Sequence, residues 1–546
     1  MPISGGHLLV RCLEAQGVTN GFGVPGESYL DVLDALHDSP IEFIGCRQEG
    51  GAAYAASAWG VLTGSPGIAF VTRGPGATNA SVGLHTAMQD SAPMILFVGQ
   101  AGLDHLEREA YQEVDYRAFF GPLVKWATQI ESADRIPEIV SRAFTTALSG
   151  RPGPVVVALP ENVLSAQTTV NPGLPVVIPD PAPSPTAVAS VAELLDESVM
   201  PLVITGGLRG GDATPALAEF AEANHLPVVA TFRRNDVIDN HSTSYVGDAG
   251  VGMMRHVERL IAEADLILAV DVRFDEMMTK AYTLFDMPDA VQHIVHVHPS
   301  DRELGKVVHA DVPIQATGEQ FWTAIAGAEL NVPEGRVDWC SQARADFVAA
   351  LRAPTQPGDL DMAEVMVWLQ EHLPPNVIIT NGAGNFSAWP NKYFAFGPEA
   401  RLLAPQSGSM GYGLPAAIAA KVSEPDRTVV AFVGDGEIQM TIQELGSAAQ
   451  CGAQPIVLIF NNGMYGTIRM HQEGTYPARV SGTEITNPDF VAIGKAYGFH
   501  SERVQKTSEF AAAFQRAEES STGAIIELMM SPEQLTATRS VDDLRG

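Results

Sequence analysis

The chain has 546 residues and a formal net charge of −31, because 64 Asp and Glu outnumber 33 Lys and Arg. So negative a chain argues against nucleic acid and anionic membranes as partners, since both are bound through clustered cations. With 46% apolar and 18% charged residues, the chain is not expected to be disordered, and its length predicts several domains.

The four cysteines form no C-x-x-C pair, which argues against a disulfide framework and a zinc knuckle. The first residues lack a basic stretch followed by an apolar core, and no apolar run approaches the roughly 20 residues that span a bilayer. We therefore expect a cytoplasmic protein without a signal peptide.

Short apolar, β-branched runs alternate with longer amphipathic stretches along most of the chain. Runs that are apolar on both faces and separated by helical segments predict parallel sheets covered by helices. The candidate strands, in chain order, are residues 67–72, 94–99, 154–159, 202–205, 228–232, 266–272, 294–298, 377–380, 428–433, 456–460 and 524–529.

Two proline-rich breaks divide this pattern. Residues 172–185 contain six prolines, and neither a helix interior nor a central strand accommodates them. A weaker break runs through residues 354–358. The expected fold is α/β, with three doubly wound parallel-sheet domains. These domains are expected at about residues 1–170, 186–340 and 360–546.

The strongest chemical signal is a Gly-Asp-Gly turn that follows the apolar run 428–432. Asp435 lies in this turn, and Asn462 follows the next apolar run, 27 residues later. One strand–helix–strand crossover takes about that length, so both side chains should lie at the carboxyl ends of neighbouring parallel strands. There, carboxylate, amide and carbonyl oxygens suit a hard cation such as Mg²⁺. A lone Gly-Asp-Gly is more often a plain tight turn, and the adjacent pair Asn461 and Asn462 makes the metal site the better interpretation.

Gly-Asp-Gly, then about 25 residues, then Asn-Asn resembles the signature of thiamine-diphosphate enzymes. The resemblance implies that Asp435 and Asn462 bind Mg²⁺ through their side chains, and Met464 through its backbone carbonyl. It implies a central domain between a pyrimidine-binding N-terminal domain and a diphosphate-binding C-terminal domain.

The same resemblance implies which residues lie against the cofactor's diphosphate. They come from two glycine-rich turns: Gly434, Gly436 and Glu437 in the first, and Gly384, Asn385 and Phe386 in the second. Most members of the family carry a small residue in place of Glu437. A carboxylate there would repel diphosphate unless it points away.

The cofactor's pyrimidine ring must exchange a proton with a carboxylic acid, which requires an acid in an apolar pocket. Glu49 is followed by a run of Gly and Ala that predicts a tightly packed helix. Alone, it would more often be a carboxylate that pairs with the helix dipole. The resemblance implies that Glu49 activates the cofactor, with Pro75 and Asn79 near the pyrimidine. It further implies that the Gly408 carbonyl accepts from the 4′-amino group and that Met410 holds the cofactor bent.

Within the family, the chain is most similar to acetolactate synthase catalytic subunits, over residues 111–115, 150–155 and 410–417. This implies a decarboxylating carboligase that joins the enamine from pyruvate or a similar 2-oxo acid to a carbonyl acceptor. Gln112 and His471 would face the substrate. In such enzymes each pocket takes residues from two chains, which implies a homodimer or a homotetramer.

Residues 273–276, Arg-Phe-Asp-Glu, are similar to a segment that lines FAD in the biosynthetic synthases. An exposed charged turn explains so short a stretch equally well. FAD is therefore compatible with the sequence but is not predicted.

Two departures from the synthases leave the reaction open. They usually carry Gly or Ala where this chain has Glu27, and an acid there resembles the residue that helps protonate the enamine in pyruvate-decarboxylase-like enzymes. A helix cap explains Glu27 equally well. The synthases also carry a Trp where this chain has His471. The alternative is a non-ligating 2-oxo acid decarboxylase, or a lyase that cleaves 2-hydroxy ketones.

Two other classes are disfavoured. Residues 21–26 have the Gly-x-Gly-x-x-Gly spacing of a nicotinamide-dependent dehydrogenase. However, a helix must begin within that motif, and the Val-Pro pair inside it would prevent this. A non-catalytic relative is disfavoured because Glu49, Asp435 and Asn462 are all present.

Overall fold

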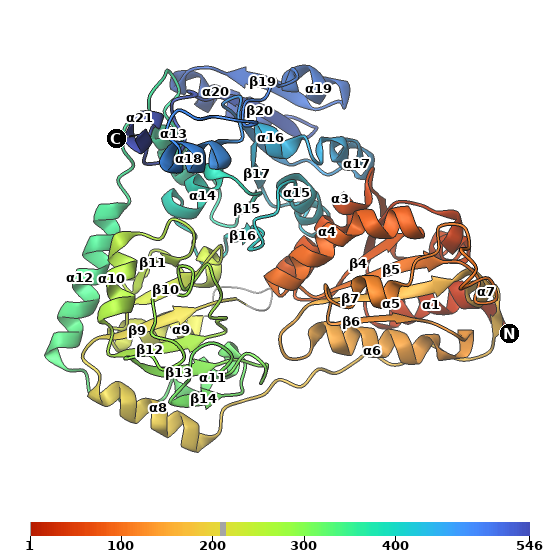
Figure 1. Ribbon diagram of the computed structural model, residues 1–546, viewed down its shortest axis with the longest axis horizontal. Coiled ribbons are helices and arrows are strands. Elements are labelled where there is room, and N and C mark those ends of the chain that lie inside the picture. The colour runs from red at the N-terminus through yellow and green to blue at the C-terminus, as the bar shows by residue number, and fades with distance from the viewer. Residues whose placement is uncertain (1, 208–214, 546) are drawn as a thin grey trace.

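The computed structural model describes residues 2–207 and 215–545. In this part of the chain the strands form three six-stranded sheets, within which all neighbouring strands run parallel. The sheets lie in three lobes at the corners of a triangle, and helices cover them (Figure 1). The predicted α/β class, with three doubly wound parallel sheets, is thereby confirmed.

The N-terminal lobe has the strand order β3-β2-β4-β5-β7-β6. Its strands are β2 (Asn20–Gly23), β3 (Glu42–Gly45), β4 (Gly67–Val71), β5 (Met94–Gln100), β6 (Trp126–Gln129) and β7 (Pro154–Pro160). Its helices are α1 (Gly5–Ala15), η1 (Glu27–Tyr29), α2 (Leu30–His37), α3 (Glu49–Thr63), α4 (Gly74–Asp90), α5 (Tyr116–Phe120), η2 (Ala133–Arg135), α6 (Ile136–Leu148) and α7 (Glu161–Ser165). A short antiparallel pair, β1 (Ile3–Ser4) and β8 (Gln167–Thr168), ties the two ends of the lobe together.

The central lobe has the order β11-β10-β9-β12-β13-β14. Its strands are β9 (Pro201–Thr205), β10 (Val228–Thr231), β11 (Tyr245–Ala249), β12 (Leu266–Val270), β13 (His293–Val297) and β14 (Val312–Ile314). Its helices are α8 (Pro185–Glu197), α9 (Pro215–Ala223), η3 (Asn235–Val237), α10 (Arg255–Glu263), α11 (Gly318–Ile325) and α12 (Glu334–Ala350). The chain winds from β9 toward one edge and then from β12 toward the other, so the winding direction reverses between these two strands.

The C-terminal lobe has the order β16-β15-β17-β18-β20-β19. Its strands are β15 (Ile378–Asn381), β16 (Arg401–Leu403), β17 (Val429–Gly434), β18 (Ile456–Asn461), β19 (His500–Val504) and β20 (Ala524–Met529). Its helices are α13 (Met362–His372), η4 (Asn385–Ser387), α14 (Ala388–Tyr393), α15 (Gly413–Ser423), α16 (Asp435–Ile438), η5 (Ile442–Glu444), α17 (Leu445–Cys451), α18 (Gly466–Thr475), α19 (Phe490–Ala496), α20 (Thr507–Glu518) and α21 (Val541–Arg545). None of the helices in the described residues is long and apolar enough to cross a membrane.

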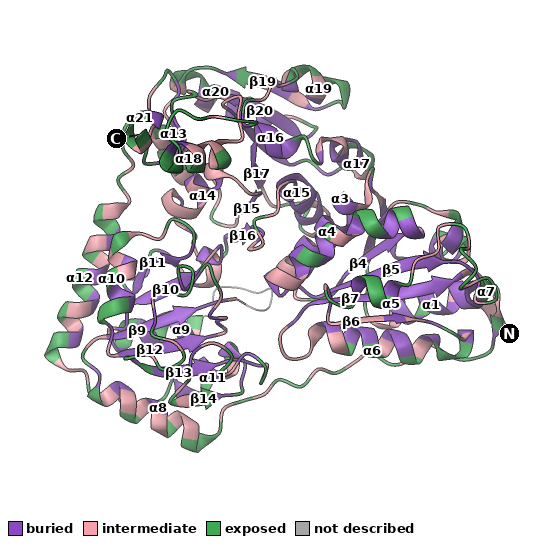
Figure 2. Ribbon diagram, viewed as in Figure 1, coloured by how far each residue is buried: buried purple, intermediate pink, exposed green. Residues whose placement is uncertain are grey.

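The predicted strands all coincide with inner strands of the sheets, which are buried (Figure 2). The strands at the six sheet edges, β3, β6, β11, β14, β16 and β19, were not predicted. An edge strand has one neighbour, so its sequence mixes polar with apolar residues, as in the His-Ser-Glu-Arg-Val of β19. The inner strand β2 was not predicted either, because its Asn-Gly-Phe-Gly lacks β-branched residues. The three sheets fall within the three predicted domain ranges, whose limits stay a prediction.

Small residues let the N-terminal and C-terminal lobes pack closely. The alanine-rich helices α3 and α15 belong to one continuous buried core. Within the N-terminal lobe, a Cβ added at Gly83 of α4 would lie 2.3 Å from the Cβ of Ala53 in α3. Such packing leaves no room for larger residues. It therefore fixes the first turns of α3 and α4, where Glu49 and Gly74 lie.

The three lobes meet at Asp90, the last residue of α4. Its Oδ1 accepts the N–H of Gln406 in the C-terminal lobe at 2.7 Å. Its backbone carbonyl accepts from Nη2 of Arg234 in the central lobe at 3.0 Å. Burial raises the pKa of Asp90 to about 6, although nearby arginines, Arg234 foremost, act in the opposite direction.

This pKa predicts how Asp90 affects stability as a function of pH. A carboxyl group whose pKa is raised on folding contributes most below its unfolded value, near 4, and that contribution is lost as the pH rises through about 6. We expect the natural chain to lose about 2–3 kcal/mol of unfolding free energy between these values relative to Asp90→Asn, measured by urea denaturation. The exposed Asp38→Asn serves as the control. If the free energy of unfolding changed with pH equally in Asp90→Asn and the natural chain, the raised pKa of Asp90 would be contradicted.

Candidate active site

The carboxylate of Asp435 is buried at the carboxyl end of β17, where Asp435 begins α16. Its Oδ1 accepts the Gly436 N–H at 2.8 Å. Its Oδ2 accepts the Gly463 N–H at 2.8 Å and an Nδ2–H of Asn487 at 2.7 Å. Burial raises the pKa of Asp435 above its ordinary value, and these hydrogen bonds act in the opposite direction. The donors fix the direction of the carboxylate at the edge of the sheet.

The two asparagines at the end of β18, Asn461 within the strand and Asn462 after it, face different surroundings. Asn461 donates from Nδ2 to Glu527 Oε1 at 2.7 Å, and its Oδ1 accepts from Asn487 at 2.9 Å. Asn487 therefore bridges Asn461 and Asp435. Sequence reasoning missed Asn487 because it is a lone amide in the loop before α19 and belongs to no motif. Asn462, in contrast, is half-buried at the start of the loop that leads to α18.

A short antiparallel β-bridge to Glu484 sets the direction in which the backbone groups of Met464 point. The bridging hydrogen bonds come from its neighbours: Ile485 donates to the Gly463 carbonyl at 2.9 Å, and Tyr465 donates to the Thr483 carbonyl at 2.8 Å. In this pattern, the backbone N–H and C=O of the residue between the two hydrogen-bonded neighbours, Met464, point away from the partner strand. The Met464 carbonyl is therefore directed away from residues 483–485.

The side chain of Glu437 connects several glycine turns of the C-terminal lobe. Its buried carboxylate accepts the N–H groups of Gly411 at 2.9 Å, Gly434 at 3.2 Å and Gly413 at 3.4 Å. A Cβ added at Gly382 would lie 1.8 Å from Glu437 Oε1. Burial raises the pKa of Glu437 to about 7. The carboxylate is thus directed at backbone donors inside the lobe, the orientation that lessens repulsion of a diphosphate.

The second glycine turn packs against the first. A Cβ added at Gly384 would lie 2.4 Å from the Phe386 ring, and one added at Gly434 would lie 2.8 Å from the same ring. Only glycine permits such an approach at both positions. Asn385 donates from Nδ2 to the Leu535 carbonyl at 2.7 Å, so this turn is also tied to the C-terminal segment.

Glu49 is the first residue of α3 and is half-buried. Its Oε2 accepts an Nδ2–H of Asn79 at 2.9 Å. A Cβ added at Gly76 would lie 3.3 Å from Glu49 Oε1, and Pro75 is exposed in the same turn of α4. The structure thus brings Glu49, Pro75 and Asn79 together at the N-termini of two closely packed helices.

The loop at residues 408–410 is held by the same helix. The Tyr54 hydroxyl, one turn further along α3, lies 2.5 Å from Ser409 Oγ and donates to the Met410 carbonyl at 3.2 Å. Gly408 has a φ of +66°, in the left-handed region that favours glycine. The backbone conformation at Gly408, and not a lack of space for a side chain, is the reason that glycine is favoured there.

Glu27 forms an ion pair. Its Oε1 accepts from Nη2 of the buried Arg73 at 2.7 Å, and the same nitrogen lies 2.9 Å from Oε1 of Glu161. The Arg73 guanidinium also lies over the Tyr111 ring, 5.9 Å from its centroid. Glu27 is the first residue of η1, whose N-cap residue is Gly26. Sequence reasoning missed Arg73 and Glu161, because only the strand order brings the ends of β2, β4 and β7 to one edge.

Gln112 and His471 are less tightly held. Gln112 has a φ of +61°, and its carbonyl accepts the Gly74 N–H at 3.0 Å. His471 is exposed on α18. Across the described ranges, no hydrogen bond or ion pair holds either side chain, so the geometry leaves the substrate-facing role predicted for them untested.

The predicted residues therefore form two clusters. One contains Glu49 and Asn79 in the N-terminal lobe, and the other contains Asp435 with the loop after β18 in the C-terminal lobe. No hydrogen bond between described residues joins these two clusters within the chain.

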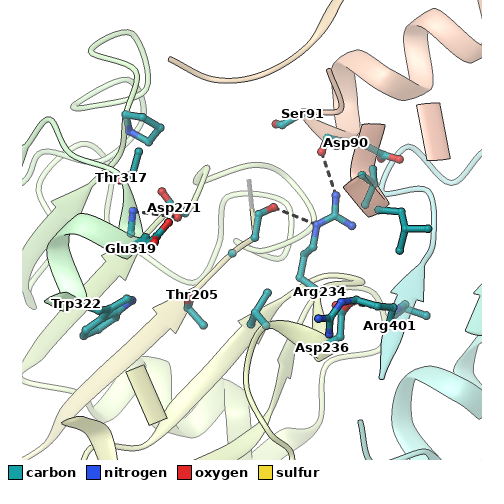
Figure 3. A pocket seen from close by; sticks show the side chains of 18 of the residues that line it. Asp90, Ser91, Thr205, Arg234, Asp236, Asp271, Thr317, Glu319, Trp322 and Arg401 are labelled. Atoms are coloured by element: carbon teal, nitrogen blue, oxygen red, sulfur yellow. Dashed lines mark hydrogen bonds between the residues drawn. The ribbon is translucent and has the colours of Figure 1, made fainter. Parts of the chain in front are cut away.

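A separate cavity of about 630 Å³ opens at the carboxyl edge of the central sheet, between the ends of β9 and β12 (Figure 3). An adjoining cavity of about 210 Å³ is lined by Arg273, Asp275 and Glu276, the segment similar to one that lines FAD. Both cavities are lined by Asp271 and Gly206.

The central cavity has room for a nucleotide, and both carboxylates and the guanidiniums of Arg234 and Arg401 line it. In parallel α/β sheets, phosphates bind at a helix N-terminus beside the strand ends. Here Asp271 Oδ2 accepts the N–H of Gly318, the first residue of α11, at 3.2 Å. A carboxylate thus lies at this helix N-terminus, and FAD stays compatible with the described residues without being predicted.

Comparison with known proteins agrees with the fold. Three models of thiamine pyrophosphate (thiamine diphosphate) enzymes match the chain: the N-terminal TPP binding domain at residues 3–119, the central domain at 188–325 and the C-terminal TPP binding domain at 382–528. The chain is 31% identical to the acetolactate synthase isozyme 2 large subunit of Escherichia coli (strain K12), over 94% of this chain and 92% of that one. It is 33% identical to the acetolactate synthase large subunit of Parasynechococcus marenigrum, over 91% and 82%, and 32% identical to that of Corynebacterium glutamicum, over 95% and 85%. The chain belongs to the thiamine pyrophosphate enzyme family.

The contacts of Glu437 predict the effect of replacing it with Gln. An amide has one acceptor oxygen, so at least one buried N–H of the glycine turns would lose its partner. We expect Glu437→Gln to lower the free energy of unfolding by about 1–3 kcal/mol and to weaken thiamine diphosphate binding. Urea denaturation and a cofactor titration measure the two effects, with the exposed Glu424→Gln as control. An unchanged stability would rule out the proposed connecting role.

Proposed function

We propose that this chain is a thiamine-diphosphate- and Mg²⁺-dependent carboligase. It decarboxylates a 2-oxo acid such as pyruvate and joins the remaining carbon unit to a carbonyl acceptor. The observation that carries the proposal is the meeting of Asp435 with the loop of Asn462 and Met464 at the carboxyl ends of two paired parallel strands. Similarity to acetolactate synthase large subunits over 94% of the chain supports the same reaction class.

The oxygen atoms at this edge suit Mg²⁺. Asp435 offers one buried carboxylate, Asn462 an amide oxygen and Met464 a backbone carbonyl directed away from its bridging strand. Mg²⁺ prefers such hard oxygen ligands in octahedral geometry and keeps sites for phosphate oxygens. We propose that these three residues bind the ion and that the glycines at 434 and 436 let the diphosphate approach the backbone closely.

Thiamine diphosphate, when bound, supplies a nucleophilic carbon and the electron sink for loss of CO₂. The role of Glu49 is to exchange a proton with the pyrimidine N1′, and the Asn79 amide orients its carboxylate at 2.9 Å. Gly408 and Met410 hold the pyrimidine end, and Tyr54 fixes their loop. Gly384, Asn385 and Phe386 complete the diphosphate end.

We further propose that one pocket uses two chains. The Glu49 cluster and the Asp435 cluster are each assembled within the chain, but no hydrogen bond between described residues joins them. A homodimer would let Glu49 of one chain face Asp435 of its partner. Gln112 from one chain and His471 from the other would then face the substrate.

The alternative functions, plain decarboxylation or the cleavage of a 2-hydroxy ketone, depend on Glu27. If the carbon that has lost CO₂ is protonated, the product is an aldehyde. If that carbon instead bonds to a carbonyl acceptor, the product is longer. A carboxylate that accepts a charge-assisted hydrogen bond from a guanidinium is held as an acceptor. The 2.7 Å pair with Arg73 therefore favours the carboligase over the decarboxylase.

Cofactor binding and turnover test the proposal. With Mg²⁺ and pyruvate, we expect Glu49→Gln to bind thiamine diphosphate as the natural chain does and to turn over at least about 100-fold more slowly, because proton exchange is lost. Asp435→Asn should lose Mg²⁺-dependent binding. Binding is measured by calorimetry and products by chromatography, with the exposed Glu42→Gln as control. If the natural chain does not bind the cofactor, the proposed function is wrong.

The Arg73–Glu27 pair predicts a change of product. We expect Arg73→Met to release Glu27 as a proton donor and to raise the aldehyde share from pyruvate about threefold or more. The double variant Arg73→Met/Glu27→Gln should return the share to that of the natural chain. If Arg73→Met leaves the ratio unchanged, Glu27 does not control the reaction.

A further inference from the structure

A buried carboxylate connects the interior of the C-terminal sheet to the candidate metal site. Glu527 lies on the inner strand β20, whose other residues are Ala, Ile, Leu and Met, and its side chain is 1% exposed. A charge in such surroundings is costly unless it is paired and hydrogen-bonded. Each oxygen of Glu527 has its own partner at 2.7 Å: Oε2 accepts from Nε of Arg503, and Oε1 accepts from Nδ2 of Asn461.

The parallel register brings these three side chains to one face of the sheet. Arg503 of β19 is paired with Glu527 of β20, and Glu527 is in turn paired with Ile459 of β18. Asn461 lies two residues after Ile459, and residues two apart on a strand face the same side. Asn461 is also the last residue of β18, where the candidate metal site begins. The row of Arg503, Glu527 and Asn461 therefore leads from the sheet edge to that site.

The carboxylates of Glu527 and Asp435 determine which way the amides between them face. A carboxylate accepts hydrogen bonds, so Asn461 presents its NH₂ group to Glu527 and its Oδ1 to Asn487. Asn487 donates from Nδ2 to Asn461 at 2.9 Å and to Asp435 at 2.7 Å. Its own Oδ1 accepts from Gln439 at 3.0 Å. If the Asn487 amide were turned over, its oxygen would face the Asp435 carboxylate and the two would repel each other.

We propose that Glu527 is a positioning residue for Asp435. It fixes the orientation of Asn461, which fixes that of Asn487, and the Asn487 amide keeps the Asp435 carboxylate in its observed direction. Groups that hydrogen-bond a metal ligand from behind orient it, and the loss of one typically lowers metal affinity about 10- to 100-fold. The inference rests on the proposed function, because it takes Asp435 as a ligand of Mg²⁺.

Glutamine at position 527 cannot replace the carboxylate while Arg503 is present. An amide has one acceptor oxygen, whereas Arg503 and Asn461 both donate toward this position. The guanidinium is charged and donates only, so the amide oxygen should turn toward it. The new NH₂ group would then face the NH₂ group of Asn461, and the Asn461 amide would turn over. Asn487 would thereby lose the acceptor that fixes its orientation.

The test compares Glu527→Gln with the double variant Arg503→Met/Glu527→Gln. Calorimetry measures the Mg²⁺ concentration that each protein needs for half-maximal binding of thiamine diphosphate. We expect Glu527→Gln to need at least about tenfold more Mg²⁺ than the natural chain. Without the guanidinium, the new amide oxygen is free to accept from Asn461, so the double variant should need within about threefold of the natural amount.

The matched control is Asp489→Asn, because Asp489 is an exposed carboxylate that accepts from the same guanidinium, at 3.1 Å. Its Mg²⁺ requirement should equal that of the natural chain. Urea denaturation without Mg²⁺ establishes that the variants are folded. If Glu527→Gln does not fold, the double variant carries the test, and a Mg²⁺ requirement raised tenfold in it would contradict the proposal.

Three outcomes would overturn the inference. If Glu527→Gln needs no more Mg²⁺ than the natural chain, Glu527 does not position Asp435, and the proposed function is unaffected. If the double variant needs as much Mg²⁺ as Glu527→Gln or more, the effect comes from the lost ion pair and not from the direction of the amides. If the natural chain itself does not bind thiamine diphosphate with Mg²⁺, the proposed function is wrong and this inference is wrong with it.

Discussion

The pairing of β17 with β18 is the constraint on which the candidate active site depends. Parallel neighbours end at the same edge, so Asp435, after the first strand, meets the backbone of Gly463, after the second, at 2.8 Å. The carboxylate would be costly to bury alone, and three donors compensate for the loss of water. Asn487 connects this carboxylate to Asn461, and through it the site is tied to the core of the lobe.

Negative charge is placed differently in each lobe. In the C-terminal lobe, the buried Glu437 is directed at backbone N–H groups of glycine turns. In the N-terminal lobe, Glu27 is paired with a buried guanidinium. In the central lobe, Asp271 lies on the end of a helix. In an acidic chain, local donors rather than net charge thus decide where each carboxylate is held.

The sequence predicted those parts that depend on short-range patterns. Most inner strands are largely apolar runs, which made them predictable, whereas β2 was missed. The placement of Asp435 and Asn462 at neighbouring strand ends followed from their spacing of one crossover. Glu49 and Met464 followed from resemblance to the family. The contacts of Arg73 could not be predicted, because they depend on the order in which β2, β4 and β7 lie in the sheet. The edge strands were not predicted because they lack a uniform apolar run, as in the Tyr-Val-Gly-Asp-Ala of β11.

The central claim is that Glu49 of one chain and Asp435 of another complete a single thiamine diphosphate site. The most direct measurement mixes two inactive variants, Glu49→Gln and Asp435→Asn, by joint expression and assays turnover of pyruvate. Random pairing in a dimer gives half mixed dimers, each with one intact site of two, so about a quarter of the natural activity should return. A mixture that stays as inactive as its two components would contradict the account.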